Sequence, residues 1–227
     1  MPVKIGIVDS GIDGETFAVA AATGFAPDGA GGVREVPATP DRVGHGSAVA
    51  AIIQSLAPAV RFVDAQVFPV RRGADPALAA AGIRWCLRQG VRIVNLSFGA
   101  LDDRHELRTA CAEAARQGVL VIAAHPARGP AVFPAAYPEV LAVSGDARCE
   151  GAAWSVLERG RLYGTSPRAA DGRTPGGASF AAARLAGIAA RCFAASSELS
   201  PAAVRAWLDG HAAHSGRERR SPAPALA

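Results

Sequence analysis

The sequence predicts an α/β fold in which a mostly parallel central sheet is flanked by helices. Short apolar runs alternate with longer segments of helical periodicity along the 227 residues, as expected for repeated strand–helix–strand units. Residues 119–124 form one continuous apolar run, which is typical of a strand buried on both faces of a parallel sheet. Half of the residues are hydrophobic, so the chain has enough apolar side chains for one well-buried domain.

The first part of the chain is predicted to begin with a central strand over residues 3–8, where apolar residues alternate and Asp-Ser-Gly follows. Residues 23–44 are rich in Gly, Pro and Asp, which indicates a surface loop with one edge strand. A helix is expected over residues 45–56, before Pro58, and a second strand over residues 61–67.

The middle of the chain repeats the alternation. Asp75 followed by Pro76 predicts a helix start, with the helix reaching about residue 89. A strand is expected over residues 92–96. A helix over residues 106–117 follows and ends at Gly118, a favoured residue after a helix.

The last part of the chain is predicted to contain the strands 119–124 and 140–144, followed by an irregular region over residues 150–176. Short strands are expected in that region near Trp154 and Tyr163. Helices are predicted over the alanine-rich residues 178–195 and over residues 201–208. We expect residues 213–227 to be a disordered tail, which leaves residues 1–212 as one domain.

Composition argues against several classes of function. The net charge of +4 is modest, and no cluster of Lys and Arg interleaved with aromatic residues marks a nucleic-acid groove. No apolar run reaches the roughly 20 residues that span a bilayer, so we predict no membrane insertion. The four cysteines show no metal-ligand spacing, and Asp28, Asp41 and Asp64 are scattered. We therefore assign no metal and no cofactor.

The beginning of the sequence favours a cytoplasmic protein. The first predicted strand starts at residue 3, and no basic-then-apolar signal segment or long folding segment precedes it. In that compartment the cysteines are expected to be thiols rather than disulfides.

Three glycine-containing segments carry the residues with the most chemical potential. They read KIGIVDSG at 4–11, GHGSAVA at 44–50 and GGASFAAA at 176–183, and they contain Asp9, His45 and Ser179. A serine hydroxyl becomes a good nucleophile when an imidazole takes its proton, and a carboxylate orients that imidazole. Taken singly, Asp9 could be a turn residue, His45 a structural histidine and Ser179 a helix N-cap. Together they favour a nucleophilic triad.

These segments resemble those of the subtilisin-like serine proteases. The first is similar to the family's strand ending in Asp-Ser-Gly, the second to His-Gly-Thr-His-Val-Ala-Gly, and the third to Gly-Thr-Ser-Met-Ala-Thr-Pro-His-Val-Ala-Gly. The stretches VNLSFG at 94–99, VLVIAA at 119–124, FPAAYP at 133–138 and VLAV at 140–143 also match, so the resemblance runs from residue 3 to about residue 210. It implies the family's three-layer subtilisin-like fold, with Ser179 as nucleophile, His45 as general base and acid, and Asp9 as the group that orients His45.

The resemblance also implies a groove that binds peptide as an extended strand. Ser97, Phe98 and Gly99 match one wall of the family's first specificity pocket, and Ala123 and Ala124 match the opposing wall. The alternative for these residues is that they are simple strand ends. Strand addition would make a peptide or protein substrate the partner of this chain.

The sequence departs from the family where an oxyanion-hole asparagine is usual. Residues 124–129 read AHPARG, which puts Ala127 or Pro126 at the asparagine position. His125 is the nearest side-chain donor; its alternative role is that of a strand-end histidine bonded to backbone. Because one missing donor slows turnover by about 10²–10³, a slow enzyme with one dedicated substrate is expected.

Three functions follow from these residues. The first is a serine endopeptidase that resembles the small family members removing leader peptides from modified peptides or enzyme subunits. The second is a catalytically weak or inactive module that binds peptide in the same cleft. The third is a macrocyclase that captures the acyl-enzyme with an amine. Cleavage specificity and oligomeric state are not determined by the sequence.

Overall fold

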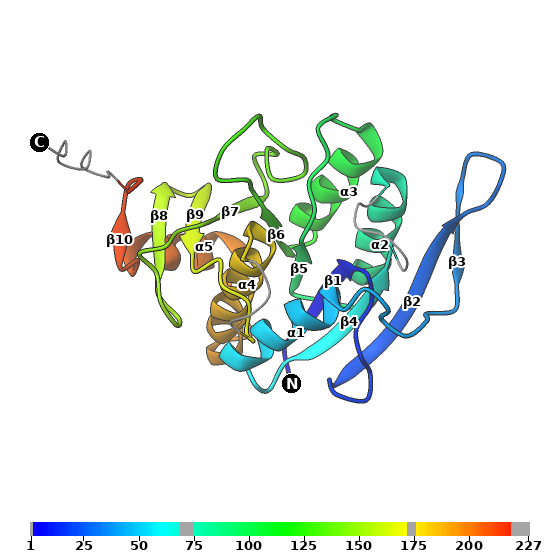
Figure 1. Cartoon of the computed structure of the whole chain (residues 1–227), viewed down its shortest axis with the longest axis horizontal. Helices are drawn as coiled ribbons and strands as arrows, with labels where there is room; N and C mark the ends of the chain where they lie inside the picture. The colour runs from blue at the N-terminus through cyan, green and yellow to red at the C-terminus, as the bar shows by residue number, and fades with distance from the viewer. Residues whose placement is uncertain (1, 69–74, 172–175, 219–227) are drawn as a thin grey trace, which may run out of the picture.

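The computed structural model describes residues 2–68, 75–171 and 176–218, and it has a helix–sheet–helix arrangement (Figure 1). Within these residues the strands form one sheet in the order β10-β8-β9-β7-β6-β5-β1-β4-β2-β3. The α/β architecture expected from the sequence, with a mostly parallel sheet flanked by helices, is confirmed.

The centre of the sheet is parallel from β2 to β9. Each of its strands pairs in parallel with the next, and β1 is at the middle between β4 and β5. Most of its strands are buried because their residues are almost all apolar, as in a sheet covered on both faces. The strands are β1 Lys4–Asp9, β2 Val19–Pro27, β4 Arg61–Gln66, β5 Ile93–Leu96, β6 Leu120–Ala124, β7 Leu141–Gly145 and β9 Leu162–Thr165.

One edge of the sheet corrects a prediction. Residues 23–44 were expected to be a loop with one edge strand, but β2 begins at Val19 and forms an antiparallel hairpin with β3 Val33–Val36. The Asp28 carboxylate closes the hairpin by accepting the Ala30 and Gly32 amides, both at 2.8 Å. β2 is rich in alanine and β3 at the edge has only four residues, so neither has the strong apolar–polar alternation that identifies a strand in sequence.

The opposite edge contains the two short strands expected near Trp154 and Tyr163. β8 Trp154–Glu158 pairs antiparallel with β9. β10 His214–Ser215 then adds in parallel to β8, and the Arg148 guanidinium donates to the Gly216 carbonyl at 2.7 Å. The boundary predicted at residue 212 is therefore too early, since residues 213–216 belong to the sheet through non-local pairing. Residues 219–227 of the predicted tail lie outside the described residues.

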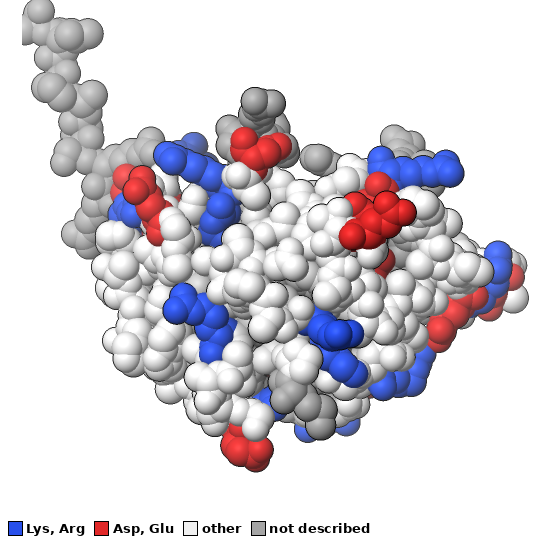
Figure 2. All heavy atoms as spheres, turned by 90° about the horizontal axis from the view of Figure 1, so that it is seen from below, with Lys and Arg blue, Asp and Glu red and all other residues white. Residues whose placement is uncertain are grey.

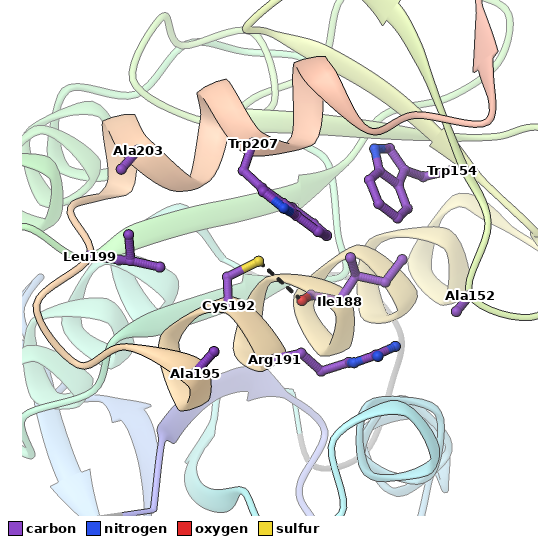
Figure 3. A pocket seen from close by; sticks show the side chains of 9 residues that line it. All are labelled: Ala152, Trp154, Ile188, Arg191, Cys192, Ala195, Leu199, Ala203 and Trp207. Atoms are coloured by element: carbon purple, nitrogen blue, oxygen red, sulfur yellow. Dashed lines mark hydrogen bonds between the residues drawn. The ribbon is translucent and has the colours of Figure 1, made fainter.

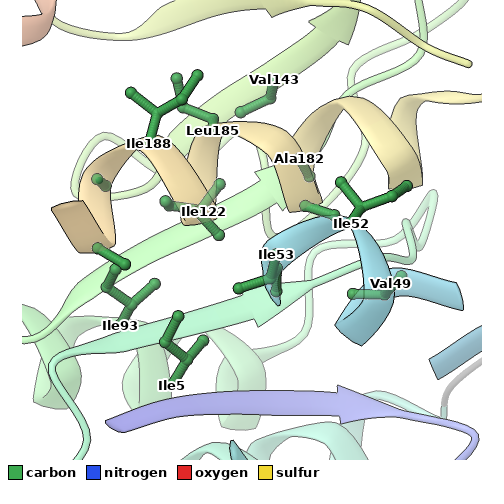
Figure 4. Packing of buried hydrophobic residues seen from close by; sticks show 14 of the residues in the cluster. Ile5, Val49, Ile52, Ile53, Ile93, Ile122, Val143, Ala182, Leu185 and Ile188 are labelled. Atoms are coloured by element: carbon green, nitrogen blue, oxygen red, sulfur yellow. The ribbon is translucent and has the colours of Figure 1, made fainter. Parts of the chain in front are cut away.

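Helices cover both faces of the sheet. The helices α1 His45–Leu56, α4 Ala178–Ala195 and α5 Pro201–Gly210 pack on one face, and α2 Pro76–Arg88 and α3 His105–Arg116 on the other. The α2 start is as predicted, because the Asp75 side chain accepts the Ala77 amide at 2.8 Å. Figure 4 shows the core on the α4 face, where Ile5, Ile93 and Ile122 from neighbouring strands lie in one apolar cluster with Ile53 of α1 and Leu185 of α4.

Close packing of α1 against α4 is what brings two of the chemically interesting helix starts together. A Cβ atom at Gly187 of α4 would lie 2.9 Å from Leu56 Cβ and 3.1 Å from the Ile53 carbonyl of α1, closer than real contacts allow, so only glycine permits this approach. Among the described helices, α4 alone has the length and hydropathy to cross a bilayer, but 67% of it is buried within the protein as a core helix. Its apolar character is therefore accounted for by packing.

Candidate active site

The carboxyl ends of three adjacent strands meet where the site was expected. Asp9 ends β1, Ser97 follows β5, and Ala124 ends β6. The register pairs Val8 with Leu96 and Leu96 with Ala123, so these ends are level with one another. Ligands of open α/β sheets gather at such an edge.

Asp9 and His45 form a direct contact in this edge. The Asp9 Oδ1 atom lies 2.7 Å from His45 Nδ1, and the Asp9 side chain is fully buried while that of His45 is 11% exposed. Asp9 Oδ1 also accepts the Ser10 amide at 2.7 Å. The carboxylate therefore fixes the ring orientation and favours the tautomer with a proton on Nδ1.

Ser179 occupies the second position of α4, and its hydroxyl donates to the Ser97 carbonyl at 2.9 Å. The N-cap of α4 is Gly177, with no side-chain cap, so the alternative of Ser179 as a helix cap is wrong. The His45 ring stacks on Phe180, with centroids 5.9 Å apart and an interplanar angle of 26°. This stack holds the imidazole beside the helix start that carries Ser179.

Glycine is required where the turn after Asp9 meets α1. A Cβ atom at Gly46 would collide with the Gly11 carbonyl, and Gly11 itself has φ +128°. The Ser10 hydroxyl accepts the Gly46 amide at 3.0 Å. The turn is thereby pressed directly onto the first turn of α1, next to His45.

Asp41 organises the start of α1, a role that the sequence did not reveal. Its carboxylate accepts the Ser10 hydroxyl at 2.9 Å, the Gly44 amide at 2.8 Å and the Ser47 hydroxyl at 2.7 Å. Burial raises the pKa of Asp41, but the hydrogen bonds from Ser47 and Gly44 outweigh it and lower the pKa overall. Asp41 is thus an ionised clamp between the Ser10 turn and the helix.

Two further buried polar residues near the site were also missed by sequence reasoning. The Gln66 side chain donates to the Ser10 carbonyl at 2.8 Å. Asn95, fully buried in β5, donates to Ser97 Oγ at 2.9 Å, and its Oδ1 atom has no partner among the described residues. Both follow strand periodicity, so a sequence pattern presents them as ordinary strand positions.

The residues proposed as groove walls differ in what the structure shows. Ser97 faces Ser179 through its carbonyl, and Gly99 is exposed. Ala123 and Ala124 are buried strand-end residues, at 0% and 7% exposure, so their side chains belong to the core, and both residues pair with the neighbouring strand β7.

The chain beyond Gly99 pairs with the segment that follows β6. Ala100 and Phe133 exchange two backbone hydrogen bonds of 2.8 Å, and Phe98 packs with the apolar cluster on the α2–α3 face of the sheet. Phe98 therefore contributes to packing in this structure as well as lying beside Ser97.

His125 directly follows β6 at the same sheet edge. Its backbone amide donates to the Val143 carbonyl at 2.8 Å, which continues the β6–β7 pairing by one residue. Its Nδ1 atom is buried and has no hydrogen-bond partner among the residues described. Since an unpaired buried N–H is costly, the tautomer with the proton on Nε2 is favoured.

An apolar pocket lies away from these residues, between α4 and α5 (Figure 3). It has a volume of about 700 Å³, and Trp154, Trp207 and Leu199 line it. The Cys192 thiol at its floor donates to the Ile188 carbonyl of the same helix. The pocket involves the second half of α4, several turns from Ser179, and is separate from the candidate active site.

Charged side chains are dispersed on the surface shown in Figure 2, where basic and acidic groups are interspersed. Several of the exposed ones pair with each other, as Arg88 does with Glu35 at 2.6 Å and Arg104 with Asp102 at 3.1 Å. Pairs this exposed contribute little to stability. On this face the described residues that are basic are separated by acidic and uncharged ones.

Comparison with known proteins gives related sequences and structures. The chain is 38% identical over 107 residues to subtilisin-like protease het-Q2 of Podospora anserina, covering 42% of this chain and 29% of that protein. It is 29% identical over 157 residues to subtilisin Savinase of Lederbergia lenta, covering 62% and 54% of the two chains. The chain thus spans less than two thirds of either relative.

The fold has solved counterparts too. The nisin leader peptidase NisP from Lactococcus lactis has a TM-score of 0.72 and 17% identity, with 91% of this chain and 81% of that chain covered. At this identity the likeness shows the fold alone. The model of the subtilase family, Peptidase_S8, matches residues 2–222. Because that match takes in nearly the whole chain, the protein belongs to the subtilase family.

Proposed function

We propose that this protein is a serine endopeptidase in which Asp9, His45 and Ser179 act as the catalytic triad. The observation that carries the proposal is the 2.7 Å contact between the fully buried Asp9 carboxylate and His45 Nδ1. A carboxylate so placed leaves Nε2 of the imidazole as the acceptor for a serine proton. Family membership and the position of Ser179 beside the His45–Phe180 stack support the same assignment.

In this mechanism Ser179 Oγ attacks the carbonyl carbon of the scissile bond while its proton passes to His45 Nε2. Asp9 stabilises the imidazolium that forms, and the imidazolium then protonates the leaving amine. A water molecule, which gives its proton to His45, then attacks the acyl-enzyme and releases the acyl group as an acid. The hydroxyl hydrogen that bonds the Ser97 carbonyl in the free protein rotates toward the imidazole for this step, and reactive contacts commonly tighten only when substrate binds.

His125 is proposed to supply the side-chain donor of the oxyanion hole, from Nε2. The unpartnered Nδ1 atom supports the tautomer that carries the proton on Nε2, and the Ser179 amide at the start of α4 would be the second donor. We expect His125→Ala to lower kcat by about 10²-fold with little change in KM, because the lost interaction is made in the transition state.

The control for that variant is His125→Gln, which keeps an N–H donor and should retain most of the activity. Steady-state kinetics on one peptide substrate would compare the two variants. Equal rates for wild-type protein and His125→Ala would assign the oxyanion to backbone donors alone.

The proposed substrate is one dedicated peptide or protein, bound as an extended strand along Ser97–Gly99 and cut to remove a leader. Strand addition draws its affinity from main-chain hydrogen bonds, which fits the buried side chains of Ala123 and Ala124. The structural likeness to the leader peptidase NisP favours this substrate class. A cross-linked enzyme subunit, such as the small subunit of quinohemoprotein amine dehydrogenase, is one candidate of this kind.

The direct test is covalent labelling by a fluorophosphonate, which reacts with a serine activated by its general base. We expect one equivalent of label, located on Ser179 by peptide mass spectrometry, and no label on Ser179→Ala. Ser55→Ala is the matched control, because its hydroxyl also donates to a backbone carbonyl, that of Ile52, but lies outside the site. A folded wild-type protein that takes no label would favour the peptide-binding module instead, a role with which the missing oxyanion asparagine agrees.

A further inference from the structure

A second buried aspartate lies one strand away from Asp9. Asp64 is in β4, where it pairs with Ile7 of β1, and it is 2% exposed. Its Oδ2 atom accepts the Ile12 amide at 3.0 Å, while its Oδ1 atom is buried and has no partner in the described part of the chain. A buried carboxyl oxygen without a donor is costly, so this residue calls for a functional explanation.

The Ile12 amide belongs to the turn that directly follows Asp9. Three backbone groups of this turn form hydrogen bonds with side chains from other segments. Gln66 bonds the Ser10 carbonyl, Asp64 the Ile12 amide, and Ser47 the Asp13 amide at 3.0 Å. Since Asp9 is covalently continuous with the turn, these bonds determine where its carboxylate meets His45. The turn is also held at the Ser10 hydroxyl by Asp41. Of these holders Asp41 and Asp64 can gain or lose a proton, and Asp64 is the one bonded to a backbone amide of the turn.

The charged side chains that act on Asp64 are acidic. Asp9 faces it from β1, and Asp41 from the segment before α1; both raise the pKa of Asp64, although burial is the larger cause. Hydrogen bonding to the Ile12 amide acts in the opposite direction, and the pKa comes to about 7. On the α2 side the titratable group is Cys86, whose own pKa is raised by burial and by Asp64. His45 approaches the same cluster through Asp9.

Asp9, like Asp64, has one buried carboxyl oxygen without a hydrogen-bond partner among the described residues; in Asp9 this atom is Oδ2. Neighbouring carboxyl groups in a buried region disfavour each other's ionised form, and the Asp9 charge adds to burial in raising the pKa of Asp64. Of these two carboxyl groups, Asp9 is the one in contact with His45.

We propose that Asp64 is a positioning residue for the triad: it holds the turn behind Asp9 through the Ile12 amide, and its protonation is linked to that of His45. As a neutral acid it anchors the turn without opposing the Asp9 charge. Once ionised, it places a second negative charge behind Asp9, which favours the imidazolium form of His45. This inference rests on the proposed serine-protease function.

The test is the rate of fluorophosphonate labelling of the full chain between about pH 5 and pH 9, for wild-type protein, D64N and D64A. Asparagine keeps an acceptor for the Ile12 amide and cannot ionise, whereas alanine removes both. For wild-type protein we expect the fall in labelling rate toward acid pH to extend over two ionisations, those of Asp64 and His45. For D64N we expect a one-proton limb with its midpoint about half a pH unit lower or more.

The labelling rate on the high-pH plateau distinguishes the positioning role of Asp64 from the effect of its charge. We expect D64A to label about tenfold or more slowly than D64N at its plateau, since only D64A releases the turn. The matched control is D28N, because the Asp28 carboxylate also accepts backbone amides in a turn, those of Ala30 and Gly32, but lies in the β2–β3 hairpin; it should label as wild type does.

Two results would overturn the inference: a D64N midpoint equal to that of wild-type protein, or equal plateaus for D64A and D64N. Should D64A fail to fold by circular dichroism, Asp64→Ser replaces it, since serine is small and its hydroxyl is too short to restore the original contact. A wild-type protein that takes no label at all would instead contradict the proposed function, so the two failures are distinguishable.

Discussion

Replacing Ser179 or His45 by alanine is expected to lower kcat by about 10⁶-fold, and replacing both is expected to lower it no further. Residues that act as one unit lose their function together, so their effects do not add. Asp9→Asn is expected to cost about 10⁴-fold, because the amide presents the wrong hydrogen-bonding pattern to His45 Nδ1 and leaves the ring in the unproductive tautomer. The expectation for Asp9 also rests on its full burial and on the 2.7 Å contact of its carboxylate with His45 Nδ1.

The measurement is single-turnover cleavage of a leader-bearing peptide, with product identified by mass spectrometry. Hydrolysis adds water to the two fragments, whereas a macrocycle would lack it, so the same spectrum separates a peptidase from a macrocyclase. Ser55→Ala is again the control and should cleave as wild type does. Additive losses for Ser179→Ala and His45→Ala would show that the two side chains do not form one catalytic unit.

Asp64→Asn is expected to stabilise the protein progressively as the pH rises from acid to neutral. The pKa of Asp64 is raised from 3.8 to about 7 in the folded protein, chiefly by burial, so the folded state binds more protons than the unfolded state between these values. Stability supplied by this group is present at low pH and is lost as the pH rises toward 7. Asparagine has no proton to lose, so the free energy of unfolding of the variant relative to wild type should increase by about 3 kcal/mol between pH 5 and pH 8.

Urea unfolding at a series of pH values measures this difference. The useful control is Asp28→Asn, because hydrogen bonds from the Ala30 and Gly32 amides lower the pKa of Asp28. A group with a lowered pKa contributes stability that is present at neutral pH and lost in acid, so this exposed control should show a small effect of opposite sign. A difference between Asp64→Asn and wild type that does not change with pH would mean that Asp64 is already ionised throughout this range.

Most of the fold could be predicted because its elements are marked by local patterns. The helix over residues 178–195 was predicted with the observed bounds, and the helices beginning near Asp75 and ending at Gly118 agree to within a residue or two. Caps, glycine stops and apolar runs are properties of neighbouring residues, so a sequence displays them. The second strand of the β2–β3 hairpin was missed because these strands lack a clear apolar pattern, and the short strand β10 was missed because its order comes from pairing with the distant strand β8.

The candidate site divides in the same way. Sequence alone determined that Asp9, His45 and Ser179 occur in this order, each within two residues of a glycine, and that no asparagine is present at the expected oxyanion position. These are statements about residue type and spacing, which the chain carries whether or not it is folded.

Only the tertiary structure decided which groups surround those residues. It placed the Ser179 hydroxyl on the Ser97 carbonyl, stacked His45 on Phe180, and gathered Asp41 and Asp64 around the turn behind Asp9. In sequence Asp41 and Asp64 were two scattered acids with no assigned role. Burial and the nearness of other charges determine what a carboxyl group does, and both arise only when strands and helices from distant parts of the chain pack together.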